Sequence, residues 1–121
     1  MRSKTAAATL TLAALTLTPV AISDAGAAAK PKPKTVKVRD NFFAPDALKV
    51  PAGSKITWRW PTNPGDVHDV KLRTAPKGVK KFKSDFASSS YSYAKTLKKP
   101  GKYFLVCTIH EEMTMTIKVK R

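Results

Sequence analysis

Short segments of alternating apolar and polar residues are the feature that most constrains the fold of this chain. In Ser54–Trp60, the apolar Ile56, Trp58 and Trp60 fall on one face of an extended chain, while polar and basic residues fall on the other. Alternation with a period of two is typical of half-buried strands. We expect further strands at Val36–Val38, Val67–Arg73, Tyr91–Leu97, Tyr103–Cys107 and Met113–Val119.

Proline- and glycine-rich turns separate these segments, and no stretch has the period of an amphipathic helix. Six or seven short strands joined in this way predict an all-β sandwich, with a small closed barrel as the alternative. The alternation turns His68 inward beside Val70 and places Asp69 on the opposite face. Residues 74–90 show no sustained period and are expected to form a long surface connection with room for one helical turn. Core residues are also expected around Pro45, namely Phe42, Phe43, Leu48 and Val50.

The first 29 residues have the composition of a secretory signal. A basic start is followed by the apolar stretch Ala6–Ile22 and by the small residues Ala25–Ala29, so we expect cleavage after Ala27 or Ala29. A membrane anchor is the alternative, but it needs about 20 strongly apolar residues, and this stretch is diluted by threonine and interrupted by Pro19. The signal predicts an exported protein that is either periplasmic, or extracellular or associated with the cell envelope.

The remaining chain, Lys30–Arg121, has 92 residues. Lysine alternates with proline in Lys30–Lys34, which we interpret as a flexible basic tether. Residues 35–121 are then expected to form one domain. A chain of this size buries one modest core and has no room for a second domain, which argues against an elaborate enzyme.

The charge of this part of the chain is strongly positive. Removing Arg2, Lys4 and Asp24 with the leader leaves 21 basic and 7 acidic residues, a net charge of +14. Such a charge favours encounter with something anionic, such as an acidic redox partner, the cell envelope or a membrane surface. We expect no nucleic-acid partner, because no aromatic stacking platform is interleaved with the lysines. A monomer is the expected oligomeric state.

The single cysteine, Cys107, cannot form a disulfide within the chain, so its thiol is buried, bound or reactive. Cys107, His110 and Met113 fall within seven residues, between the end of one expected strand and the start of the next. Thiolate, imidazole and thioether are donors that select copper over hard cations, and two histidines, a thiolate and a long axial methionine make a blue-copper site. His68 is the only other histidine. Taken singly, each of these residues is more often ordinary core, and their joint occurrence is what favours a metal.

The sequence resembles the cupredoxins, in particular the small amicyanin-like and plastocyanin-like copper proteins. Together the matching stretches cover nearly all of Val36–Val119, and their order and spacing are specific although each piece alone is weak. They are Phe43–Pro45, Leu48–Gly53, Ile56–Trp58, His68–Val70, Pro100–Tyr103 and Cys107–Met113.

The resemblance implies a Greek-key β-sandwich of about seven strands that holds one type 1 copper ion. It implies that His68, Cys107 and His110 are the equatorial ligands and that Met113 is the weak axial one. Met115 is the alternative axial ligand, since its spacing from His110 is plastocyanin-like. We prefer Met113, because Met115 continues the inward series of the last strand.

Two departures from the family pattern bear on tuning and docking. Asp69 stands where relatives often carry asparagine, and the resemblance implies its backbone N–H near the Cys107 sulfur and its carboxylate near Thr108. Glu111 and Glu112 stand where relatives commonly have small or apolar residues. Two acids beside an exposed histidine make an apolar docking surface doubtful.

The function expected from these residues is single-electron transport between redox partners, without enzymatic activity. The main alternative on the same scaffold is a protein that sequesters or delivers copper. An enzyme with Cys107 as nucleophile is disfavoured, because no oxyanion donor motif is visible. A basic envelope-binding module without metal is the remaining alternative.

Overall fold

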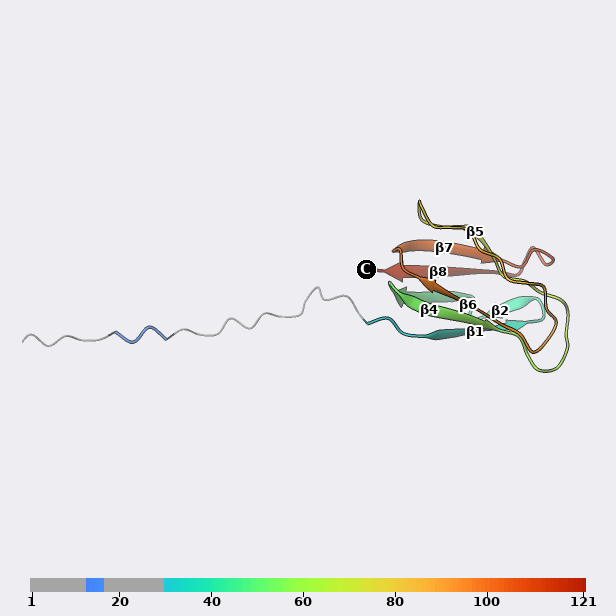
Figure 1. Cartoon of the computed structure of the whole chain (residues 1–121), viewed down its shortest axis with the longest axis horizontal. Helices are drawn as coiled ribbons and strands as arrows, with labels where there is room; N and C mark the ends of the chain where they lie inside the picture. Colours follow the sequence, from blue (N-terminus) through green and yellow to red (C-terminus); the bar gives the residue numbers. More distant parts are fainter. Residues whose placement is uncertain (1–12, 17–29) are drawn as a thin grey trace, which may run out of the picture.

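Eight strands form two four-stranded sheets that pack face to face (Figure 1). The computed structural model describes residues 13–16 and 30–121, and this part of the chain contains no helix. The strands are β1 Lys34–Arg39, β2 Phe42–Ala44, β3 Ala47–Pro51, β4 Ser54–Arg59, β5 Lys71–Thr74, β6 Ser92–Leu97, β7 Gly101–Val106 and β8 Thr114–Lys120. The predicted signal, residues 1–29, lies outside the described residues except for 13–16.

The two sheets have the strand orders β2-β1-β4-β6 and β3-β8-β7-β5. The pairs β1–β4 and β3–β8 are parallel, and the other pairs are antiparallel. Because the two sheets are separate, the predicted sandwich is confirmed and the closed barrel is excluded. The count exceeds the prediction because the residues around Pro45, expected only as core material, form the short strands β2 and β3.

The alternating residues of β4 form the centre of the core. Ile56 and Trp58 are fully buried, and the Trp58 ring lies 6.2 Å from that of Phe82 and 6.0 Å from that of Tyr93, measured between centroids. The Trp58 Nε1–H donates to the sulfur of Met115 on the facing sheet at 3.2 Å. The interior therefore has a polar link between the sheets. Phe42, expected in the core, is instead half exposed.

The segment before β5 differs from its prediction. The alternation predicts a strand over Val67–Arg73, but β5 begins at Lys71, and His68 makes only an isolated bridge with Ala87. The His68 N–H donates to the Ala87 carbonyl at 2.9 Å, and the Ala87 N–H donates back at 3.0 Å. This segment therefore pairs with the β5–β6 connection, which packs on the core without a helical turn. His68 is inward-facing as predicted, but Asp69 is buried as well.

Residues 31 and 32, just before β1, contact the β3–β4 turn. The Lys32 N–H donates to the Ser54 hydroxyl at 3.2 Å, and Pro31 lies against Gly53. Lys34 already belongs to β1, so the strand begins inside the range interpreted as a tether. In the described residues, no helix is long and apolar enough to cross a membrane.

Four connections meet at one end of the sandwich, opposite the end where the chain enters at Lys30 and leaves at Arg121 (Figure 1). We call this the site end, and define it by residues 40–41, 60–70, 84–91 and 107–113. Hydrogen bonds from Trp60 N–H to the Tyr91 carbonyl, and between His68 and Ala87, join two of these connections. The site end collects both histidines and the cysteine.

At the opposite end, Gly101 is required by its backbone and its surroundings. Its φ is +138°, and a Cβ there would lie 2.5 Å from Pro76 Cγ. Gly101→Ala is expected to lower the free energy of unfolding by about 2 kcal/mol, through backbone strain and overpacking. Gly78→Ala is the matched control, because its φ is also positive, at +85°, but its nearest neighbour is the flexible Lys99 Nζ at 3.2 Å. Urea denaturation measures both, and equal losses would contradict the role given to Pro76.

Candidate metal centre

His68, Cys107 and His110 come together at the site end. Cys107 directly follows β7, His110 lies in the β7–β8 connection, and His68 lies in the β4–β5 connection. The two Nδ1 atoms are 3.2 Å apart, and the Cys107 sulfur is 3.9 Å from Nδ1 of His68 and 3.7 Å from Nδ1 of His110. Three of the four predicted site residues therefore point their donor atoms at one another.

The size of this triangle fits a metal ion. From the three distances, a point equidistant from the donor atoms lies about 2.1 Å from each, while zinc–nitrogen and zinc–sulfur bonds in proteins measure about 2.0 to 2.3 Å. Two imidazoles with one thiolate are the equatorial donors of blue-copper sites. The chemistry and spacing of the donors thus fit copper.

Met113, the fourth predicted residue, closes the β7–β8 connection. Its side chain is buried, and its N–H donates to the His110 carbonyl at 2.9 Å. The Cys107 N–H donates to the Met113 carbonyl, also at 2.9 Å. These two hydrogen bonds hold the cysteine, the histidine and the methionine in one compact loop between two strand ends.

The sulfur of Met115 has a partner in the core. The Met115 sulfur accepts the hydrogen bond from Trp58, and its side chain is buried in the inward series of β8. A sulfur already used as the acceptor of a buried N–H is less available as a ligand. This supports Met113 over Met115 as the axial candidate.

Asp69 links the two connections that carry the candidate ligands. Its Oδ1 accepts from the Thr108 N–H at 2.7 Å, and its Oδ2 accepts from the Thr108 hydroxyl at 2.8 Å. The side chain is fully buried, with Lys83 Nζ at 3.5 Å from Oδ2. The predicted contact between the Asp69 carboxylate and Thr108 is confirmed, and the approach of the Asp69 N–H to the Cys107 sulfur stays a prediction.

Asp40 is the residue of this site that sequence reasoning missed. Its carboxylate, in the β1–β2 turn, accepts from His68 Nε2 at 3.0 Å and from the Asp66 N–H at 2.9 Å. Because Nε2 is the donor in this arrangement, the network assigns the free lone pair of His68 to Nδ1, which faces Cys107 and His110. Glycine at position 65 permits the approach, since a Cβ there would lie 2.6 Å from Asp40 Oδ1.

The electrostatics of Asp40 agree with this contact. The hydrogen bond with His68, followed by the one from the Asp66 N–H, holds the pKa of the Asp40 carboxyl below its usual range. Asp40 stands 28 positions before His68 in the sequence, and no motif connects the two residues. Only the placement of the β1–β2 turn beside the β4–β5 connection reveals the pair.

The comparisons with known proteins agree with the geometry. The family model for copper binding proteins of the plastocyanin/azurin family matches residues 33–120. Among solved structures, a copper-containing nitrite reductase from Thermus scotoductus SA-01 is 26% identical, with a TM-score of 0.64, and the match covers 77% of this chain. The chain spans only 23% of the nitrite reductase chain. No match to a curated protein was found.

Two smaller proteins share the fold over most of their length. A point mutant of amicyanin, in its reduced Cu(I) form, is 22% identical with a TM-score of 0.62, covering 71% of this chain and 80% of that one. A pseudoazurin from Sinorhizobium meliloti is 23% identical with a TM-score of 0.61, covering 74% of this chain and 75% of that one.

The two methionines give a paired test of the centre. Met115→Leu is expected to cost about 1 to 3 kcal/mol of unfolding free energy, because Trp58 Nε1 loses its acceptor, and to leave the spectrum of bound Cu(II) unchanged. Met113→Leu conserves volume and is expected to cost less than about 1.5 kcal/mol, while altering the spectrum. Urea denaturation and visible absorption measure the two effects. A spectrum altered by Met115→Leu but not by Met113→Leu would reverse the assignment.

Proposed function

The chain belongs to the plastocyanin/azurin family of copper-binding proteins, as a cupredoxin with one type 1 copper ion as its cofactor, and we propose on that premise that it carries single electrons between redox partners. The observation that carries the proposal is the convergence of two imidazole nitrogens and one thiol sulfur within 3.9 Å of one another. That donor set is the one that electron-transfer copper sites use.

We assign His68, Cys107 and His110 as the equatorial ligands and Met113 as the weak axial ligand. The assignment of Met113 is supported by its burial in the loop that Cys107 and His110 share. Three of these candidate ligands lie in the β7–β8 connection and the fourth, His68, lies in the β4–β5 connection. Hydrogen bonds between Asp69 and Thr108 join the two connections.

The contribution of the chain to electron transfer is a rigid frame. Bound copper supplies a centre that alternates between Cu(I) and Cu(II), and these states prefer different geometries. Asp40 restrains the His68 ring through Nε2, and the hydrogen bonds at Met113 hold the loop closed. A frame that moves little between the two states keeps the rearrangement that accompanies each transfer small.

We propose a carrier rather than an enzyme, because the candidate nucleophile is not accessible. Cys107 is 1% exposed, so a substrate has no path to its sulfur. The nitrite reductase to which the chain is similar is a much longer protein, and its activity is not carried over. Copper sequestration or delivery is the second candidate, and it is favoured only by the partial exposure of His110.

The setting of this activity is also a proposal. We propose that residues 1–29 are removed on export and that a monomer of residues 30–121 acts in the periplasm or at the cell envelope. The strands carry twelve lysine or arginine residues and no acidic residue, which supports contact between their outer faces and an anionic surface.

A visible spectrum tests the copper assignment. One equivalent of Cu(II) is expected to give an intense blue band that ascorbate bleaches and reoxidation restores, because a thiolate ligand is present. Cys107→Ala is expected to abolish the band in a protein that remains folded by circular dichroism. Slow loss of copper to a chelator would support a carrier and rapid loss a delivery protein. No band from folded wild-type protein would overturn the electron carrier.

Asp69 is expected to lower the reduction potential, since a buried carboxylate behind the ligand loop stabilises the more positive Cu(II) state. Asp69→Asn is therefore expected to raise the potential by some tens of millivolts, where a tenfold change in the equilibrium constant of a one-electron couple is about 59 mV. Asp46→Asn is the control, because Asp46 lies outside the site end and its substitution makes the same change in net charge. Cyclic voltammetry showing equal shifts for both variants would contradict the local effect.

A further inference from the structure

Acidic and basic side chains occupy different parts of this molecule. From Lys30 onward, all seven acidic residues lie in connections between strands, and the strands themselves hold none. Six of the seven lie at the site end: Asp40, Asp66, Asp69, Asp85, Glu111 and Glu112. The four segments of the site end contain no lysine or arginine, although the described chain has 21 of them from Lys30 onward. The four segments of the site end thus carry a net negative charge, whereas the remaining residues from Lys30 onward carry a net positive charge.

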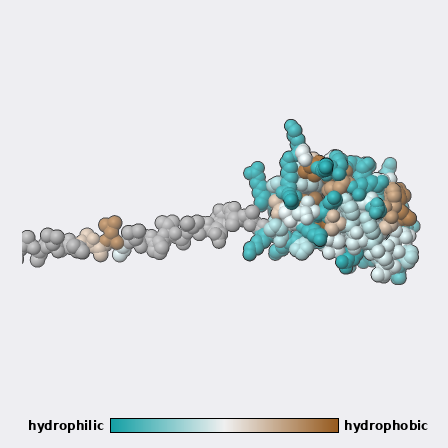
Figure 2. Space-filling view, viewed as in Figure 1, coloured by the Kyte–Doolittle hydropathy of each residue, from teal (hydrophilic) through white to brown (hydrophobic). Residues whose placement is uncertain are grey.

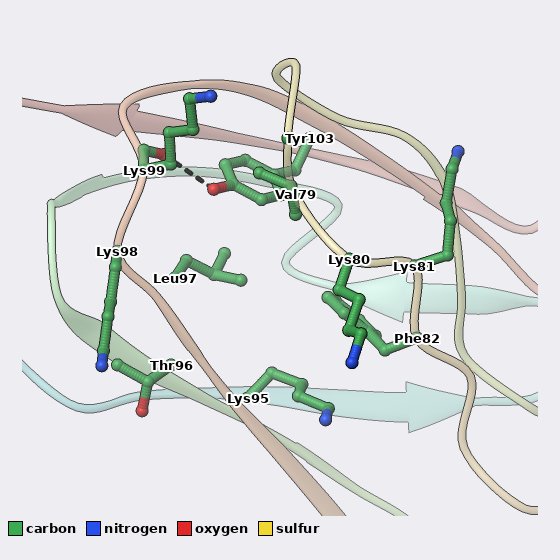
Figure 3. Close-up of a pocket in the computed structure, with 11 residues that line it drawn as sticks. Val79, Lys80, Lys81, Phe82, Lys95, Thr96, Leu97, Lys98, Lys99 and Tyr103 are labelled. Carbon is green, nitrogen blue, oxygen red and sulfur yellow. Dashed lines mark hydrogen bonds between the residues drawn. The ribbon is translucent and has the colours of Figure 1, made fainter.

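Two of the surface hollows differ in charge in the same way, whereas two others at the border of the site end are lined by Lys37 and Arg39 together with residues of the site end. A hollow of about 350 Å³ beside β6 is lined by five lysines and no acidic residue, and Figure 3 shows Lys80 and Lys95 next to Phe82, with Lys98 and Lys99 further along the rim. A hollow of about 430 Å³ at the site end is lined by Asn41 and Ile109–Met113, so its only carboxylates and only formal charges are those of Glu111 and Glu112.

His110 is the candidate ligand through which the centre reaches solvent. His68, Cys107 and Met113 are each 1% exposed, whereas His110 is half-buried and lines the hollow at the site end. Exposed apolar side chains flank both histidines in the chain, with Val67 44% and Ile109 50% exposed. Figure 2 shows apolar surface gathered at this end of the sandwich. The surface around His110 therefore combines exposed apolar side chains with carboxylates.

The range of electrostatic screening decides which charge a docking partner meets. At about 0.1 M ionic strength the Debye length is about 10 Å, so charges farther from the contact are largely screened. Glu111 and Glu112 directly follow His110 in the chain. The five lysines of the hollow beside β6 lie outside the site end and contribute less there, despite the net charge of +14, whereas Lys83 borders the site end at 3.5 Å from Asp69 Oδ2.

We propose that the surface around His110, formed by Ile109, Glu111 and Glu112, docks a redox partner protein whose own docking face is positively charged. This inference rests on the proposed electron-carrier function and names the chemistry of the partner. In the docked pair one electron passes from the reduced protein to the oxidised partner, and no bond forms or breaks. The anionic partner that the net charge suggests would meet the strand faces, away from His110.

Paramagnetic probes of opposite charge test the surface without electron transfer. Hexaamminechromium(III), a trivalent cation, is expected to broaden amide NMR signals of residues 109–112 in the reduced, copper-loaded protein at about 0.1 M ionic strength. Hexacyanochromate(III), a trivalent anion, is expected to broaden signals on the strand faces, such as those of Lys49, Lys102 and Lys118. The proposal is overturned if the anion selects residues 109–112, or if the cation shows no preference for them.

Charge-neutral variants then test the effect on transfer. Tris(phenanthroline)cobalt(III) oxidises the reduced protein by accepting one electron to become Co(II). Glu111→Gln and Glu112→Gln are each expected to slow this reaction about threefold at about 0.1 M ionic strength, since a trivalent cation loses a nearby unit charge. The same variants are expected to speed oxidation by hexacyanoferrate(III), which becomes hexacyanoferrate(II).

Asp46→Asn is the matched control, because it also raises the net charge by one but lies outside the site end. It is expected to leave both oxidation rates nearly unchanged. Equal effects from all three variants would show that the rates depend only on net charge, which would overturn the proposal. A protein without a reversible blue site would instead defeat the electron-carrier function. The cation and anion broadening patterns are read independently of that failure, since they can also be recorded on the metal-free protein.

Discussion

The hydrogen bonds between Asp69 and Thr108 are the interaction on which the site depends most. A buried carboxylate is stable only when its oxygens are paired, and here both oxygens are satisfied by one residue, with Lys83 nearby to balance the charge. Because Asp69 follows His68 and Thr108 follows Cys107, the pair sets the separation of two candidate ligands from different connections. Packing in the core aligns the strands, and the contact between Asp69 and Thr108 fixes the positions of the donor atoms of His68 and Cys107 relative to each other.

Much of the fold and of the site can be predicted because the signals are local. The alternation in β4 and β8 marks their buried faces directly, and Cys107, His110 and Met113 lie close together in the sequence. The inward direction of His68 follows from the same alternation, even though the strand expected around it does not form there. Local pattern therefore predicts the direction of this side chain better than its secondary structure.

What escapes prediction depends on contacts between distant segments. Alternation places Asp69 on the outer face, because it cannot show that a later loop, at Thr108, folds over it. Asp40 has no motif around it, and its role arises from the β1–β2 turn meeting Gly65 and His68. The segregation of charge is likewise visible only once the connections are known to meet at one end, since net charge gives no direction.

The lysines of the outer strands also bear on how the protein behaves when it is concentrated. The edge strands are β2 and β6 in one sheet and β3 and β5 in the other, and the edge of β5 is covered by the β5–β6 connection, where the Leu72 N–H donates to the Phe82 carbonyl. Unpaired strand edges can join with those of other chains. Two of the three uncovered edges carry basic side chains, Lys49 on β3 and Lys95 on β6. Repulsion between like-charged edges opposes the pairing of strands from different molecules. The positive charge of the strands therefore helps to keep the protein dispersed at high concentration.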